Sequence, residues 1–262
     1  MLTAAKSPIE KHCNFIGESR VKLTEKERLT SAAGKVIRSG NNFRTVNSQR
    51  TDLLFCIVTS QTLDSFTGGV FDTNCFFLPG PNILIDAPQD SAEWLQGRGY
   101  HVELMLLTHG HIDHVWDAAR IQREHSCKVA YHAETTPMVT QKDFFRDFGF
   151  GWEIEPVKDG AHLDETESTT LQGVEFKVLY VPGHSPGHLC FLWNAQNILF
   201  GGDVLFAGGV GRWDLPGGDR DVLFQGIREK VFPLGDEVTV LPGHGPATKI
   251  GIERRTNPYV SE

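Results

Sequence analysis

The sequence has no hydrophobic run long enough to cross a membrane and no cysteine arrangement typical of a disulfide or zinc-binding framework. The best apolar stretch, Leu53–Val58, has the length of one strand, whereas a membrane helix needs about 20 apolar residues. The N-terminal region lacks the apolar segment of a secretory signal. The five cysteines are scattered without a Cys-x-x-Cys pair, which favours buried free thiols in a reducing compartment. We therefore expect a cytoplasmic protein with no membrane partner.

Positive charge is scarce in most of the chain. The 262 residues carry a net charge of −8, but residues 1–46 hold nine Lys/Arg and four Glu and are net +5, so that the remainder is net −13. An acidic body argues against nucleic acid as the main partner. We predict a basic N-terminal arm over 1–46, with one helix that begins near Thr24 and Glu27, and a single α/β domain over 47–262.

Short apolar runs separated by turn residues predict a β-rich α/β fold in the domain. The predicted strands are Leu53–Val58, Cys75–Leu78, Ile83–Ile85, Val102–Leu107, Val174–Val181, Cys190–Trp193, Ile198–Phe200 and Val238–Leu241. Helices are predicted over 114–125 and 220–232, and a short helix capped by Asp90 and Glu93 is predicted to run through Leu95. Because Val102–Leu107 is apolar except for Glu103, we expect that strand to be buried on both faces.

Histidine and aspartate gather directly after the predicted strand Val102–Leu107. Residues 108–114 read Thr-His-Gly-His-Ile-Asp-His, which places four ligand-type side chains within six residues. His109 and His111 lie two apart on an extended segment and can point the same way, whereas Asp113 and His114 turn with the following helix. One ion cannot easily accept all four groups, so the cluster could supply two neighbouring ions.

Three further ligand-type residues have the same setting of a strand followed by a glycine-rich turn, namely His184, Asp203 and His244. Imidazole and carboxylate ligands suit Zn²⁺, Fe or Mn²⁺, and the lack of thiolates argues against a closed structural zinc site. A lone histidine after a strand usually packs or caps, but seven such positions together indicate a metal centre. We expect His188 and Asp86 to support the ligands from behind, although Asp86 equally suits a plain turn at the end of a strand.

This residue set resembles the metallo-β-lactamase superfamily, over roughly residues 50–262. Within it, the chain is similar to the short glyoxalase II (hydroxyacylglutathione hydrolase) type, through the stretches Pro182–His188, Gly211–Asp219, Gly243–Pro246 and Arg255–Pro258. The resemblance implies an αββα sandwich, in which two mixed β-sheets are flanked by helices and the metal site lies at one sheet edge. It assigns the ligands of one ion as His109, His111 and His184, and those of the other as Asp113, His114 and His244, with Asp203 bridging the two.

The implied activity is a metal-dependent hydrolase that uses a metal-bound hydroxide, with two divalent transition-metal ions, zinc before iron or manganese. Asp113 and Asp203 are the expected catalytic residues, because Asp113 can orient the hydroxide and Asp203 bridges the ions. A small-molecule thioester such as an acylglutathione suits this site, since a thiolate leaves without protonation. Arg212 stands where the family contacts glutathione, whereas Asp214 replaces the family's tyrosine, so Arg212 equally suits an ion pair with Asp214.

Other activities of this fold stay open at the level of sequence. A persulfide dioxygenase with a single iron could keep all seven ligands, although the stretch Leu215–Asp219 resembles the hydrolases more. Another ester or lactone hydrolase is a further alternative. β-Lactamases of this fold usually lack the aspartate of the His-x-His-x-Asp-His motif, so we do not expect β-lactam hydrolysis.

Overall fold

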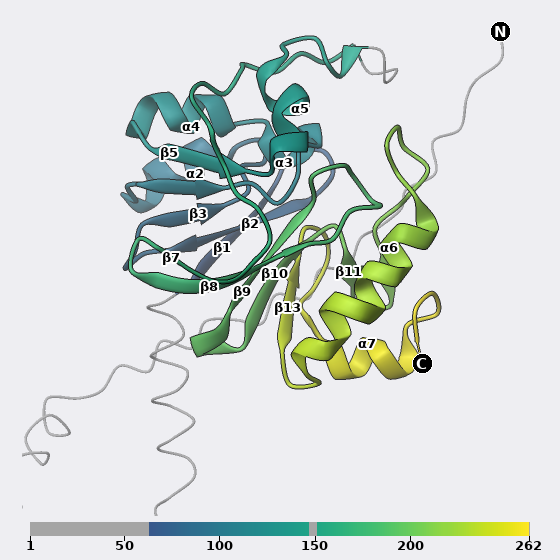
Figure 1. Cartoon of the computed structure of the whole chain (residues 1–262). Helices are drawn as coiled ribbons and strands as arrows, with labels where there is room; N and C mark the ends of the chain where they lie inside the picture. Colours follow the sequence, from purple (N-terminus) through teal and green to yellow (C-terminus); the bar gives the residue numbers. More distant parts are fainter. Residues whose placement is uncertain (1–62, 147–150, 262) are drawn as a thin grey trace, which may run out of the picture. The chain divides into compact units, whose positions relative to one another are not determined.

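The computed structural model describes residues 63–146 and 151–261 (Figure 1). These residues belong to one compact unit that spans Ser48–Glu262. The predicted arm over 1–46, its helix and the predicted strand Leu53–Val58 lie outside the described residues and stay predictions. Within the described part of the chain, no helix is long and apolar enough to span a membrane.

The first sheet has six strands in the order β1-β2-β3-β4-β5-β6. They are β1 (Asp64–Gly68), β2 (Thr73–Leu78), β3 (Ile83–Ile85), β4 (Leu104–Leu106), β5 (Lys128–Tyr131) and β6 (Ala161–His162). Strands β1 to β3 are antiparallel and β3 to β6 are parallel, so the sheet is mixed. The strands expected at β2, β3 and β4 are confirmed, and all three residues of β4 are buried as predicted.

The second sheet also has six strands, in the order β14-β13-β10-β9-β8-β7. They are β14 (Thr248–Lys249), β13 (Thr239–Pro242), β10 (Ile198–Gly202), β9 (Leu189–Trp193), β8 (Val174–Tyr180) and β7 (Thr166–Leu171). Strands β10 and β13 pair in parallel, and their neighbours pair antiparallel. A small hairpin of β11 (Leu205–Phe206) and β12 (Gly209–Val210) follows β10 and was not predicted.

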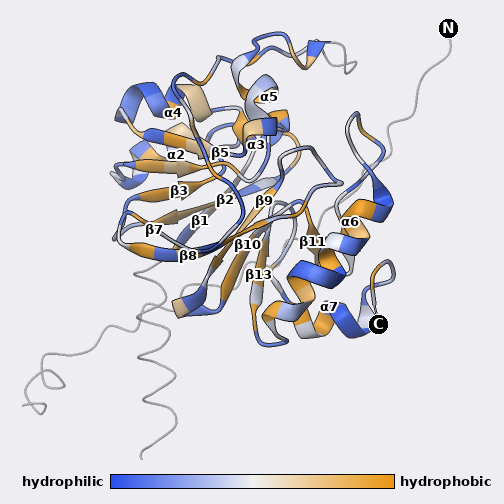
Figure 2. Ribbon diagram, viewed as in Figure 1, coloured by the Kyte–Doolittle hydropathy of each residue, from blue (hydrophilic) through white to orange (hydrophobic). Residues whose placement is uncertain are grey.

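The two sheets pack face to face, with helices on both outer faces (Figures 1 and 2). Side chains of β2 alternate between the two sides of its sheet: Phe76 packs against Phe200 of the second sheet at 5.5 Å between ring centroids, whereas Cys75 and Phe77 face the helices. This period of two residues is the expected consequence of strand geometry. The predicted αββα sandwich is therefore confirmed.

Helices α2 (Ser91–Arg98) and α4 (Ala118–His125) pack on the first sheet, and α6 (Arg220–Gly226) and α7 (Ile250–Thr256) pack on the second. Two short helices, α3 (Ile112–Val115) and α5 (Thr136–Thr140), lie near the edge that carries the site. The helix expected over 220–232 is confirmed as α6 and a π-helical continuation, Ile227–Val231.

Two helix predictions were wrong in detail, and Asp117 explains both. The helix expected over 114–125 divides into α3 and α4, because the Asp117 backbone N–H donates to the Ala87 carbonyl at 3.0 Å. The Asp117 carboxylate accepts a hydrogen bond from the Ala92 backbone N–H at 3.1 Å and so caps α2. Asp90, the expected cap, has a φ of 71° and makes no side-chain cap hydrogen bond.

A seam of hydrogen bonds joins the first sheet to the turn after β13. The Asn74 backbone N–H donates to the Gly243 carbonyl at 2.7 Å, and its side-chain amide donates to the carbonyls of Pro242 and Gly245 at 3.0 and 2.9 Å. Thr73 also forms an isolated β-bridge with His244. The seam therefore fixes the turn that carries His244 against the start of β2.

Candidate metal centre

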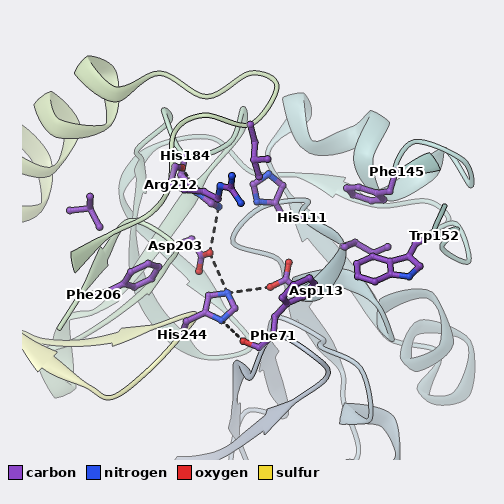
Figure 3. Close-up of a pocket in the computed structure, with 13 residues that line it drawn as sticks. Phe71, His111, Asp113, Phe145, Trp152, His184, Asp203, Phe206, Arg212 and His244 are labelled. Carbon is purple, nitrogen blue, oxygen red and sulfur yellow. Dashed lines mark hydrogen bonds and ion pairs between the residues drawn. The ribbon is translucent and has the colours of Figure 1, made fainter. Parts of the chain in front are cut away.

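Seven ligand-type side chains converge at one edge of the sandwich, where strands from both sheets end. Figure 3 shows those that also line a cavity, namely His111, Asp113, His184, Asp203 and His244. Residues 108–114 follow β4, Asp203 follows β10, and His244 follows β13, while His184 lies in the turn between β8 and β9. Because β10 and β13 are parallel, their carboxyl ends meet at the same edge. The structure thus brings together every residue that the sequence predicted as a metal ligand.

Three histidines form the first group. His109 Nε2 lies 3.1 Å from His111 Nδ1 and 3.3 Å from His184 Nε2. His184 directs its other ring nitrogen, Nδ1, at the Arg212 backbone carbonyl at 2.7 Å. Since a carbonyl only accepts, Nδ1 carries the proton and Nε2 offers a lone pair to the centre.

The second group consists of Asp113, His114 and His244, with Asp203 beside it. His244 Nε2 lies 3.2 Å from Asp113 Oδ2 and 3.4 Å from Asp203 Oδ2. His114 Nε2 lies 3.3 Å from Asp203 Oδ1, and His184 Nε2 of the first group lies 3.5 Å from Asp203 Oδ2. Asp203 therefore stands between the two groups and reaches both.

The hydrogen bonds behind the centre set which ring nitrogen faces it. His114 Nδ1 lies 2.8 Å from Asp86 Oδ2, which places the proton on Nδ1 and leaves Nε2 free to bind. His244 Nδ1 donates in the same way to the Phe71 carbonyl at 3.0 Å. Thr108 Oγ1 donates its proton to Asp86 at 2.8 Å, so at its 3.1 Å contact with His109 Nδ1 it can only accept. His109 Nδ1 therefore carries the ring proton, and Nε2 faces the centre with a lone pair.

The donor set fits metal cations. The Nε2 lone pairs of His109 and His184 face each other across 3.3 Å, which is repulsive unless a cation or proton lies between them. In the second group, His114 Nε2 and Asp203 Oδ1 are buried and form an ion pair at 3.3 Å, but neither atom makes a hydrogen bond. Buried polar atoms without hydrogen bonds are costly, and coordination of an ion would satisfy them.

The charges differ between the two groups. Burial lowers the pKa of His109 well below its ordinary value and lowers the pKa of His111 to about 3, so both rings are neutral. Burial also opposes the charged form of His244, but its bonds with Asp113 and Asp203 outweigh this effect and raise its pKa to about 10. Carboxylates likewise raise the pKa of His114 against the effect of burial. In the metal-free protein, protons on His114 and His244 therefore balance the negative charge of Asp113 and Asp203, which bound metal cations would otherwise balance.

Two glycines let the turns approach this closely. A Cβ at Gly243 would lie 2.2 Å from Asp203 Oδ1 and 2.5 Å from His114 Cε1. A Cβ at Gly202, whose φ is +48°, would lie 2.7 Å from both His188 Nε2 and Thr108 Oγ1. Side chains at either position would displace the groups that form the centre.

His188 and two threonines complete the surroundings. The His188 ring stacks on His109 at 4.7 Å between centroids, and its Nε2 accepts the backbone N–H of Asp203 at 3.0 Å. Thr73 Oγ1 donates to Asp113 Oδ2 at 2.8 Å. Neither Thr73 nor Thr108 is predicted from the sequence as part of the centre. Thr108 directly precedes the motif and could have been found, whereas Thr73 lies 40 residues from Asp113 and carries no local signal.

The centre opens into a cavity of about 560 Å³. The side chains around it are mostly apolar; they include Phe71, Ile112, Phe145, Trp152, Phe206, Val210 and Leu215 beside five of the ligand-type residues. Arg212 also lines the cavity, but both of its contacting nitrogens lie 2.8 Å from the Asp214 carboxylate. The two side chains are 61% and 63% exposed, so this ion pair contributes little to stability and can exchange partners.

Comparison with known proteins identifies the family. The sequence profile of the metallo-β-lactamase superfamily matches residues 68–244. The chain belongs to this superfamily. Hydroxyacylglutathione hydrolase GloC of Haemophilus influenzae is 34% identical over 204 residues, which cover 73% of this chain and 94% of that protein. The probable metallo-hydrolase YqgX of Bacillus subtilis is 30% identical, with 64% and 81% covered.

Solved structures of the superfamily are similar over the same region. The B3 metallo-β-lactamase BLEG-1 superposes with a TM-score of 0.71 at 30% identity, and covers 76% of this chain and 100% of its own. TTHA1623 in a di-iron-bound form superposes with a TM-score of 0.67 at 36% identity, with 75% and 99% covered. The superfamily and its metallo-hydrolase character are thus shared, while the relatives differ in the substrates and metals that their names state.

Proposed function

We propose that the protein is a hydrolase with two divalent transition-metal ions that acts on a thioester such as an acylglutathione. The convergence of seven nitrogen and oxygen ligands at the floor of one cavity carries this proposal. The 34% identity to a hydroxyacylglutathione hydrolase, over 94% of its length, supports the thioester.

In this proposal each group of residues holds one ion. His109, His111 and His184 would hold the first ion, and Asp113, His114 and His244 the second, with Asp203 as a ligand of both. When bound, two such ions supply a water of lowered pKa and Lewis acidity at a carbonyl oxygen. Zinc is the first expectation for this ligand set, and the di-iron form of a similar structure makes iron the next.

The chain's own residues would orient the reactants. The Asp113 carboxylate is held by Thr73 and His244 and faces the centre, where it can accept a hydrogen bond from the attacking water. No Lys, Tyr or Glu is found among the described residues that line the cavity, so proton donors for a leaving group are few. A thiolate needs no such donor, which favours thioesters over amides.

Metal content and thioester hydrolysis, measured on the same preparations, test the proposal. We expect close to two ions per chain and hydrolysis of S-acylglutathione that ends on chelation and returns with metal. Asp203→Asn should lose both ions together and reduce activity at least a hundredfold, because one carboxylate serves both groups. Asp221→Asn, on the exposed surface of α6, is the matched control and should change neither quantity.

The alternatives give different results in the same experiment. One iron per chain with oxygen consumed in the presence of glutathione persulfide would replace the hydrolase with a dioxygenase. Hydrolysis of a lactone, an oxygen ester or a β-lactam in preference to thioesters would keep the metal centre and change the substrate; the β-lactam is included because of the similarity to BLEG-1. Full metal content in Asp203→Asn would refute the shared ligand.

A further inference from the structure

Two walls of different composition flank the metal centre. Ile112, Phe145 and Trp152 form one wall, which we call the acyl wall, and Phe206, Val210, Leu215 and Arg212 form the other, which we call the carrier wall. Figure 3 shows Phe145 and Trp152 on the side of Asp113, and Phe206 on the opposite side, beside His244. The Phe206 and His244 ring centroids are 6.2 Å apart.

The acyl wall is the surface of a small hydrophobic core. Ile112, Phe145 and Ile154 are buried in one cluster, against which Trp116 and Trp152 pack. The Trp152 ring contacts Trp116 edge-on at 5.8 Å. None of the three described residues that form the acyl wall is charged, and their one polar side-chain atom is the indole nitrogen of Trp152.

The carrier wall contains Arg212, the only Lys or Arg that lines the cavity among the described residues. Its apolar members Phe206 and Val210 belong to the β11–β12 hairpin. The buried carboxylate of Glu253, in α7, holds that hairpin in place by accepting a hydrogen bond from the Gly208 backbone N–H at 2.9 Å.

We propose that the acyl group of the substrate lies on the acyl wall, so that the enzyme selects unbranched or aromatic apolar acyl groups and rejects acyl groups that end in a charge. This inference rests on the proposed thioester hydrolysis. A carbonyl at the metal centre lies between the walls, and the two halves of a thioester must extend to opposite sides of it. The carboxylates of a peptide carrier suit the side with Arg212, which leaves the uncharged side to the acyl chain.

The contribution of the wall follows from burial of methylene groups. Each methylene removed from water raises kcat/KM about fourfold where it is fully covered, so the step from acetyl to hexanoyl is worth on the order of a hundredfold. An adipoyl group has the length of hexanoyl but ends in a carboxylate. No cation of the acyl wall can pair with it, and burial of an unpaired charge is strongly unfavourable. We expect adipoyl thioesters to react at least about a hundredfold more slowly than hexanoyl thioesters.

The test uses acetyl, butyryl, hexanoyl and adipoyl thioesters of two thiols, glutathione and N-acetylcysteamine, with the metal-loaded protein. The expected order of kcat/KM is hexanoyl, butyryl, acetyl, adipoyl on both thiols. Trp152→Ala should reduce the hexanoyl-to-acetyl ratio about tenfold, and Trp152→Leu, which keeps an apolar surface, should restore part of it. Phe206→Ala, on the carrier wall, is the matched control and should leave that ratio unchanged.

The outcomes separate this inference from the proposed function. A flat dependence on chain length, equal rates for adipoyl and hexanoyl, or a ratio that Trp152→Ala leaves unchanged would overturn the acyl wall while thioester hydrolysis stands. If the metal-loaded protein hydrolyses no thioester, the proposed function fails, and binding of the free acids still tests the wall by calorimetry. Tighter binding of hexanoate than of acetate and adipate would support the wall, and equal binding would refute it.

Discussion

Asp86→Asn alters a buried carboxylate that serves the metal centre without facing it. Asp86 is 2% exposed and accepts three hydrogen bonds of 2.8 Å, from Thr108 N–H, Thr108 Oγ1 and His114 Nδ1. Its φ of 59° lies in the left-handed region, which asparagine tolerates and alanine does not. Asparagine therefore keeps the backbone and the size of the side chain and changes only the acceptor pattern.

The expected effect follows from counting acceptors. The amide keeps one oxygen in place of two, so its NH₂ group must face either the Thr108 N–H, in place of Oδ1, or both Thr108 Oγ1 and His114 Nδ1, in place of Oδ2. If it faces His114, Nδ1 becomes the acceptor and the ring proton moves to Nε2, where it blocks coordination. If it faces the Thr108 N–H, a buried donor loses its partner, which costs about 1–3 kcal/mol. We expect metal affinity to fall about 10–100-fold, the range seen when a group that orients a metal ligand is lost.

Competition between the protein and a chelator of known affinity measures this change, and thermal unfolding of the metal-free protein measures the stability. Asp90→Asn is the matched control. Asp90 also has a positive φ, of 71°, but its side chain is exposed and makes no cap hydrogen bond. It should change neither quantity. A metal affinity of Asp86→Asn within threefold of the unaltered protein would show that His114 does not depend on this carboxylate.

Three further predictions concern the cavity, its hairpin and the metal-free state. If Arg212 binds a carboxylate of the carrier, Arg212→Ala should raise KM for glutathione thioesters about 10–100-fold. Asp214→Asn, which frees Arg212, should lower that KM. If neither variant changes KM, Arg212 only forms an ion pair with Asp214 and does not bind the carrier. Glu253→Gln should lower the free energy of unfolding by about 1–3 kcal/mol in chemical denaturation, because its buried acceptors serve three donors. The pKa of His244 is raised to about 10 in the metal-free protein, so its stabilising effect is complete below about pH 6.5 and is lost as the pH rises toward 10. Melting temperatures of chelated protein should fall over that interval, and bound metal should remove the dependence.

The proposed metal ligands could be predicted from the sequence because each lies just after a strand, in a turn that contains glycine. His109 follows a strand of the first sheet and His244 a strand of the second, and the resemblance to the superfamily predicts that both lie at one edge of the sandwich. Their partners were harder to predict. The backbone carbonyls of Arg212 and Phe71 hold the ring proton of His184 and His244 on Nδ1. Every residue has a backbone carbonyl, so the sequence does not show which ones make these contacts.

The missed strands show where hydrophobic patterns fail. Strand β7 reads Thr-Glu-Ser-Thr-Thr-Leu, lies at the edge of its sheet and has no fully buried residue, so it lacks the apolar alternation of a core strand. The β11 and β12 strands have two residues each and depend on contacts made by α7. Asp90 precedes its helix as a cap should, but the distant Asp117 provides the hydrogen bond.

The seam between Asn74 and the turn after β13 sets an order of events during folding. Asn74 and Gly245 are 171 residues apart along the chain, so this contact closes one of the longest loops that the fold can contain. Loops of this length close late, after local structure has formed. While the chain is being synthesised, the three-histidine group can assemble before His244 exists, and the second group cannot. We therefore expect stepwise metal uptake, with the second ion entering only after β13 docks and then holding the two sheets together against separation.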